Sequence, residues 1–118
     1  MRLPDFLGIG AQRSGTTWLH SLLLQHPEVC FPDHRKEIHF FDRFHERGLD
    51  WYGNLFNKCR APCAGEFTPA YMYEPACPER IHAAIPHVKL TAILRNPVER
   101  AYSQFRFDIR KRGYRLIA

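Results

Sequence analysis

The stretch from Asp5 to Leu24 reads DFLGIGAQRSGTTWLHSLLL, and it decides the fold. Its first part, Phe6 to Ile9, is a short apolar run of the kind that forms a buried strand. Its last part has the apolar spacing of a helix, at Trp18, Leu19, Leu22 and Leu23. Between them lies a glycine-bounded segment, Gly10 to Thr17. A strand, such a loop and a helix in this order predict a phosphate-binding loop, because backbone N–H groups and the helix N-terminus then point at one anion.

The loop departs at one position from the nucleoside-triphosphatase motif G-x-x-x-x-G-K-[ST]. Gly10, Gly15 and Thr17 fit the motif, but Thr16 stands where the motif has lysine. The cation inside the loop is Arg13 instead. We therefore expect the loop to bind a 5′-phosphate group through N–H groups, hydroxyls and one guanidinium, rather than ATP with magnesium. An ordinary strand-to-helix turn is the alternative interpretation.

The composition indicates a globular protein with a preference for anionic partners. The chain has 118 residues, of which 45% are apolar and 25% charged, and this length predicts a single domain over residues 1–118. Its formal net charge is +5 and its pI is near 9.3. This balance does not separate a nucleotide from an acidic glycan or a nucleic acid.

The lack of a recognisable targeting signal predicts a cytoplasmic protein. No charged-then-apolar leader precedes the first strand, and no apolar run has the length of a membrane span. The four cysteines show neither a C-x-x-C pair nor a metal-ligand spacing with histidine. We expect reduced thiols, with disulfides between some of them left open, and no metal site.

Further along the chain, strand patterns alternate with helix patterns. Strands are expected at Val29–Phe31, at the start of Glu66–Tyr73 and at Lys89–Leu94; helices at Asp50–Phe56, Pro78–Ile85 and from Asn96 to about Gly113; and a loop at Asn57–Gly65. Asn96, Pro97 and Glu99 have the order of a helix N-cap, a first-turn proline and a capping acid. This alternation predicts an α/β fold of the P-loop type, with a parallel sheet flanked by helices.

A second anion site is suggested where the last strand ends. Arg95 follows that strand, and Ser103 lies on the helix after it. Ligands bind at the carboxyl ends of the strands of an open parallel sheet, so the two side chains can bind a second phosphate group. Spacing alone leaves this open against a surface arginine and a solvated serine.

Three segments together resemble the sulfotransferase family, specifically its heparan-sulfate and carbohydrate branch. They are GAQRSGTTWL, RKEIHFFD and ILRNPVERAYSQF, in this order. The resemblance covers nearly the whole chain. It implies a sulfotransferase fold of the P-loop type, 3′-phosphoadenosine 5′-phosphosulfate (PAPS) as donor, and no metal. It also implies a carbohydrate acceptor, or alternatively a protein tyrosine, and no nucleic-acid partner.

The resemblance also implies roles for single residues. The 5′-phosphosulfate would be bound by Arg13, Ser14, Gly15, Thr16 and Thr17. The 3′-phosphate would be bound by Arg95 and Ser103. The catalytic base would be Glu37, and catalytic roles are also implied for Arg13, His39 and Asp42. Contacts with donor or acceptor are implied for Lys36, Glu37 and His39. Glu66 and Thr68 lie in a shared G-E-x-T-P-A-Y stretch, which we assign only to the shape of the pocket.

Two features limit what the resemblance implies. Carbohydrate members usually have lysine where this chain has Arg13, and the R-S-G-T-T form is familiar from tyrosylprotein sulfotransferases. Arginine keeps the charge but donates in a planar fork, so the arrangement at the leaving oxygen can differ. From the residues alone, Glu37 could be an exposed acid paired with Lys36 or Arg35, and His39 an imidazole packed between aromatic rings.

Family members also extend beyond the helix that carries Ser103, which implies that the 118 residues are an incomplete domain. A non-catalytic remnant that binds nucleotide therefore stands as an alternative function. A nucleotide kinase with a variant loop is a third, although the missing lysine at Thr16 and the lack of a magnesium carboxylate motif argue against it.

Overall fold

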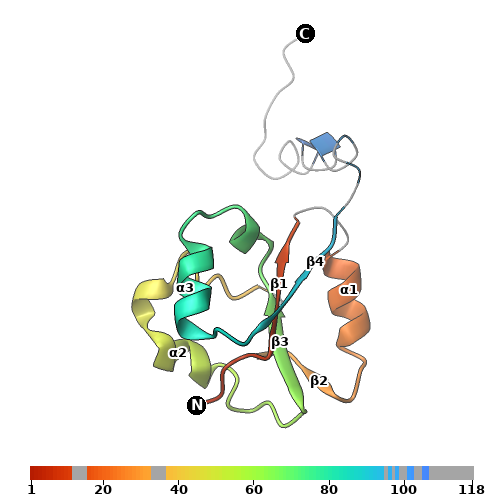
Figure 1. The fold of residues 1–118 in the computed structure, drawn as a ribbon. Helices are drawn as coiled ribbons and strands as arrows, with labels where there is room; N and C mark the ends of the chain where they lie inside the picture. The colour runs from red at the N-terminus through yellow and green to blue at the C-terminus, as the bar shows by residue number, and fades with distance from the viewer. Residues whose placement is uncertain are drawn as a thin grey trace.

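A computed structural model gives the fold of the chain (Figure 1) and describes residues 1–11, 16–32, 37–94, 96, 98, 101–102 and 105–106. The elements in chain order are β1 (Phe6–Gly10), α1 (Thr16–Leu23), β2 (Val29–Cys30), the 3₁₀ turn η2 (His45–Arg47), α2 (Leu49–Asn54), β3 (Cys63–Phe67), the 3₁₀ turn η3 (Pro69–Met72), α3 (Cys77–Ala84) and β4 (Lys89–Ala92). The predicted alternation of strands and helices is confirmed.

The strands form one parallel sheet in the order β2-β3-β1-β4. Phe6 of β1 pairs with Gly65 of β3 on one side and with Lys89 of β4 on the other. Because all strands run in one direction, their carboxyl ends meet at one edge. Figure 1 shows α1 on one side of the sheet and α2 and α3 on the other. The α/β fold predicted from the sequence is therefore confirmed.

Alternation along β1 supplies a core on each face of the sheet. Leu7 joins the larger core, which α2 and α3 cover and which includes Phe40, Phe41, Tyr52, Phe56, Tyr71, Cys77 and Ile81. Phe6 faces the other way and makes edge-to-face contacts with Phe31 and Phe67. A Cβ at Gly8 would overlap the Phe67 ring, so this aromatic packing requires glycine at position 8.

Helix α1 is where the sequence predicts it, but only part of the predicted apolar stripe faces the sheet. Trp18 is 66% exposed and Leu22 47%, although both belong to the expected apolar stripe. The buried residue is His20, whose ring centroid lies 4.4 Å from that of Phe31. The neighbouring half-buried leucines, Leu19 and Leu23, complete this face. The His20 ring therefore packs on the aromatic surface of the sheet, whereas the Trp18 indole is largely exposed.

Two other local predictions differ from the structure in part. The segment Asn57–Gly65 is predicted as loop, yet β3 already begins at Cys63, because pairing with β1 and β2 forms a strand from small residues of low strand propensity. The helix predicted at Asp50–Phe56 is present as α2, but it ends at Asn54, short of Phe56, and Tyr52 is its fully buried side chain.

The predicted N-cap of the last helix is confirmed. Asn96 Oδ1 accepts a hydrogen bond of 2.9 Å from the N–H of Val98. Val98, Ala101, Tyr102, Phe105 and Arg106 are helical, and the apolar side chains among them are exposed. In the part of the chain that the structure describes, no helix is long and apolar enough to cross a membrane.

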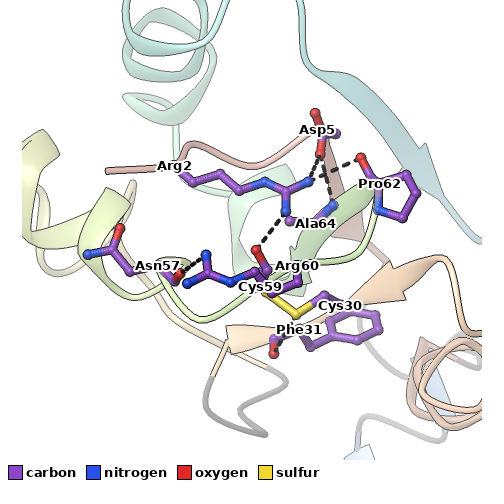
Figure 2. The surroundings of a disulfide bond; sticks show 9 residues. All are labelled: Arg2, Asp5, Cys30, Phe31, Asn57, Cys59, Arg60, Pro62 and Ala64. Atoms are coloured by element: carbon purple, nitrogen blue, oxygen red, sulfur yellow. Dashed lines mark hydrogen bonds and ion pairs between the residues drawn. A yellow bond between two sulfur atoms is a disulfide. The ribbon is translucent and has the colours of Figure 1, made fainter.

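The expectation of reduced thiols is wrong for two of the four cysteines. Cys30 of β2 and Cys59 form a disulfide across a sequence separation of 29 residues (Figure 2), whereas Cys63 and Cys77 are free. Pairing of β2 with β3 brings the two sulfurs together. Beside the disulfide, the Arg2 guanidinium donates 2.9 Å to the Cys59 carbonyl, which ties the N-terminal segment to the same loop.

We predict that the double variant Cys30→Ser/Cys59→Ser is less stable by about 3–4 kcal/mol, because a closed loop of this length restricts the unfolded chain. Urea unfolding of the oxidised protein measures the difference. Cys63→Ser removes a free, half-buried thiol and is the matched control, which should lose much less. Equal unfolding curves for the double variant and the wild type would contradict a stabilising disulfide.

Candidate functional site

In an open parallel sheet with this strand order, we expect a ligand crevice beyond the carboxyl ends of β1 and β3. The chain leaves β1 through α1 on one face of the sheet and leaves β3 through α3 on the other. Such a divergence opens a binding crevice outside the strand ends. Thr68, directly after β3, donates its N–H to the Gly8 carbonyl of β1 at 2.9 Å and so holds the two strand ends together.

Three predicted catalytic side chains lie together at this crevice. Nδ1 of His39 is 2.9 Å from Oδ2 of Asp42, and Nε2 of His39 is 3.8 Å from Oε1 of Glu37. The side chains are 41% exposed for Glu37, 18% for His39 and 7% for Asp42. The row therefore runs from a carboxylate at the surface to a buried one, with the imidazole between them.

Asp42 orients the imidazole. Its carboxylate can only accept, so the His39 proton lies on Nδ1 and leaves Nε2 towards Glu37. The separation of 3.8 Å is too long for a hydrogen bond but within ion-pair range, so both Nε2 and the Glu37 carboxylate can still bind another group. The arrangement suits proton transfer at the surface of the crevice.

His39 has a backbone conformation that L-residues rarely adopt. Its φ is 59°, and its carbonyl accepts 3.0 Å hydrogen bonds from the N–H groups of both Arg43 and Phe44. This left-handed conformation costs about 1–2 kcal/mol for a residue other than glycine. Such a conformation persists only where the surrounding structure enforces it.

Beneath this row lies a fully buried carboxylate, that of Glu66. Its Oε2 accepts from the hydroxyls of Tyr52 at 2.5 Å and Tyr71 at 2.8 Å. Its Oε1 accepts from the Thr68 hydroxyl at 2.5 Å and the Ile38 N–H at 3.3 Å. Sequence reasoning assigned Glu66 and Thr68 to pocket shape and missed both tyrosines. Tyr71 stands in the same G-E-x-T-P-A-Y stretch, but nothing in the sequence links Tyr52 to it.

The other predicted site residues are only partly described. Arg13, Ser14, Gly15, Lys36, Arg95 and Ser103 lie outside the described residues, so their predicted roles stay predictions. Thr16 and Thr17 open α1, whose start follows the end of β1 at Gly10 with only a short connection. This is the strand–loop–helix order that the sequence predicts. Within the described ranges, no three His, Cys, Asp or Glu side chains gather as metal ligands.

Comparison with known proteins identifies the family. A family model described as "Sulfotransferase domain" matches residues 3–114. The chain belongs to the sulfotransferase family. The crystal structure of a sulfotransferase from Alicyclobacillus acidocaldarius superimposes with a TM-score of 0.86 at 31% identity, covering 99% of this chain and 54% of that one.

Curated relatives extend well beyond this sulfotransferase domain. Human heparan sulfate glucosamine 3-O-sulfotransferase 6 is 41% identical over 105 residues, which are 88% of this chain and 30% of the relative. The membrane-associated sulfotransferase kil1 of Dictyostelium discoideum is 36% identical over 111 residues, which are 91% of this chain and 23% of the relative. The chain thus spans less than a third of the length of these relatives.

Burial gives Glu66 of this sulfotransferase domain a measurable effect on stability. Desolvation raises the pKa of Glu66 above its ordinary value of 4.5, although hydrogen bonds from Thr68, Tyr52, Tyr71 and Ile38 oppose the shift. The folded-state pKa then lies above the unfolded-state value. Between the two values the unfolded state binds fewer protons, so the free energy of unfolding falls as pH rises.

We predict that this fall, up to about 1.4 kcal/mol per pH unit for one proton, begins near pH 4.5 in the wild type and is reduced in Glu66→Gln. Urea unfolding at several pH values gives the two slopes. If the slopes agree throughout the window upward of pH 4.5, Glu66 does not titrate with a raised pKa.

Proposed function

We propose that this domain serves in the transfer of a sulfuryl group from PAPS to a hydroxyl or amine of a carbohydrate acceptor. The observation that carries the proposal is the row of Glu37, His39 and Asp42 at the crevice where β1 and β3 end. Membership in the sulfotransferase family supports the reaction class. The row supports an acid–base role on the acceptor side of the crevice.

Glu37 is the base in this proposal. Its side chain is 41% exposed, so an acceptor hydroxyl or amine can approach the carboxylate and lose its proton as it attacks sulfur. His39 lies beside Glu37 with its ring fixed by Asp42, so it can bind the same acceptor group through Nε2. General-base catalysis of this kind contributes about 10²- to 10⁴-fold in rate.

The donor side fits an anion held at a helix N-terminus. Helix α1 starts close after the end of β1, and backbone N–H groups at such a junction favour a phosphate group. In the proposal, Arg13 to Thr17 hold the 5′-phosphosulfate, and Arg95 and Ser103 hold the 3′-phosphate. PAPS supplies an activated sulfuryl group, and Arg13 stabilises the negative charge that grows on the leaving oxygen.

A carbohydrate acceptor is supported by the human relative, which is named for the glucosamine of heparan sulfate. A protein tyrosine stands as the alternative because of the R-S-G-T-T form of the loop. A cytoplasmic location stays a prediction. The Cys30–Cys59 disulfide weighs against it, since disulfides persist mainly in oxidising compartments.

We predict that Glu37→Gln lowers turnover by about two orders of magnitude, because the variant keeps the size of the side chain but removes the base. Transfer of labelled sulfate from PAPS to glycans, tyrosine peptides and small phenols measures turnover. Donor affinity should stay within about threefold, since Arg13 to Thr17 bind the donor in the proposal. Unchanged turnover would remove Glu37 as the base and make His39 the next candidate. Donor binding without any transfer by the wild-type chain would instead uphold the non-catalytic alternative.

A second experiment tests the 3′-phosphate site. Arg95→Ala should weaken the binding of 3′-phosphoadenosine 5′-phosphate about ten- to a hundredfold, the loss expected for one charged hydrogen bond. Binding of adenosine 5′-phosphate, which lacks the 3′-phosphate, should hardly change. Calorimetric titration of both nucleotides, with ATP–Mg²⁺ as the ligand expected of a kinase, gives the comparison. Equal weakening of both adenosine nucleotides would contradict the assignment of Arg95.

A further inference from the structure

Three successive backbone N–H groups beside the catalytic row bond to side-chain hydroxyls. The N–H groups of Ile38 and His39 donate to the Thr68 hydroxyl at 3.1 and 3.3 Å, and that of Ile38 is shared with Glu66 Oε1 at 3.3 Å. The N–H of Phe40 donates to the Tyr71 hydroxyl at 3.0 Å. Residues 37–39 belong to no helix or strand. In this segment the two hydroxyls therefore accept the backbone hydrogen bonds that the carbonyls of a neighbouring strand would accept in a sheet.

The direction of these hydrogen bonds depends on Glu66. A hydroxyl has a single proton, and those of Thr68 and Tyr71 both go to the Glu66 carboxylate. The hydroxyl lone pairs are then left to accept from the backbone N–H groups. A carboxylate accepts only, so it holds both hydroxyls in this direction at once.

We propose that Glu66 is a positioning residue that acts through Thr68 and Tyr71 to fix the backbone of residues 38–40 and so aim Glu37 and His39 at the crevice. The effect on catalysis in this proposal rests on the proposed sulfuryl transfer. The fixing of the backbone by Glu66 does not depend on it. The left-handed conformation of His39 is the reason that such a constraint is needed, because that residue would otherwise relax to a common backbone geometry.

The two tyrosines provide a matched pair for the test. Tyr52 and Tyr71 are both buried, and both donate to Oε2 of Glu66. Of the two hydroxyls, that of Tyr71 also accepts from the N–H of Phe40. Tyr52→Phe therefore removes one donor to Glu66 and leaves the hydroxyl contacts of the 38–40 backbone in place. Tyr71→Phe removes both kinds of contact.

Hydrogen exchange on the 118-residue chain tests the structural part without any need for activity. We expect Thr68→Val to speed exchange at the N–H of His39, since that of Ile38 keeps Glu66 Oε1 as an acceptor, and Tyr71→Phe at that of Phe40, each by on the order of tenfold. Thr68→Ser, which keeps the hydroxyl, should restore slow exchange. In Tyr52→Phe, exchange at these N–H groups should speed up no more than the loss of global stability accounts for. Similar local effects of Tyr52→Phe and Tyr71→Phe would overturn the proposal.

Glu66→Gln tests the direction of the hydroxyls. The new amide nitrogen can only donate, so either Thr68 or Tyr71 loses the acceptor of its hydroxyl proton, and that hydroxyl is no longer held with its lone pairs towards the backbone N–H groups. We expect faster exchange at one or more of residues 38–40 although the side chain keeps its size. Protection equal to that of the wild type would overturn the role of Glu66. If this variant does not fold, Thr68→Val and Tyr71→Phe decide the proposal alone.

Sulfate transfer tests the catalytic part. Thr68→Val and Tyr71→Phe should lower kcat at least tenfold more than Tyr52→Phe does, with donor affinity unchanged and with recovery in Thr68→Ser. Equal losses of kcat in the two tyrosine variants would overturn the aiming of Glu37 and His39. A wild-type chain that transfers no sulfate would contradict the proposed function instead, and hydrogen exchange would still decide whether Glu66 positions this segment.

Discussion

The Glu66 carboxylate lies fully buried behind the crevice, where an ion would cost several kcal/mol if its oxygens lacked donors. Its four donors come from three parts of the chain: Ile38 in the segment before α2, Tyr52 on α2, and Thr68 and Tyr71 shortly after Glu66 itself. These elements must therefore assemble together for any of them to be satisfied. The same assembly forms the larger core around Leu7, so packing and polar satisfaction support one arrangement.

The two sides of the crevice are built in different ways. The side proposed for the donor comes from one continuous stretch of sequence, from β1 to α1. The acceptor side comes from a segment without regular structure, which hydroxyls from a different part of the chain hold in place. The segment that carries Glu37 and His39 depends instead on long-range contacts, so changes far from the crevice can reach the catalytic row.

The Cys30–Cys59 disulfide also links distant parts of the chain, at the amino ends of the strands. It joins β2 to the loop after α2, and Arg2 binds the same loop through the Cys59 carbonyl. The strand that leads to Glu66 starts from this tied region, at Cys63. Edge strand β2 has only two residues, so a covalent link adds stability where its few strand hydrogen bonds supply little.

The sequence by itself determined the features that rest on local spacing. These are β1, α1, the Asn96 N-cap, the parallel α/β fold and the family motifs that include Glu37, His39 and Asp42. Only the tertiary structure decided that Tyr52 and Tyr71 meet Glu66, that His20 rather than Trp18 faces the sheet, that β3 begins at Cys63, and that Cys30 joins Cys59. Each of these depends on which strands become neighbours. Periodicity reports the environment of a residue along its own element, whereas its partner across the sheet is chosen by the packing of the whole chain.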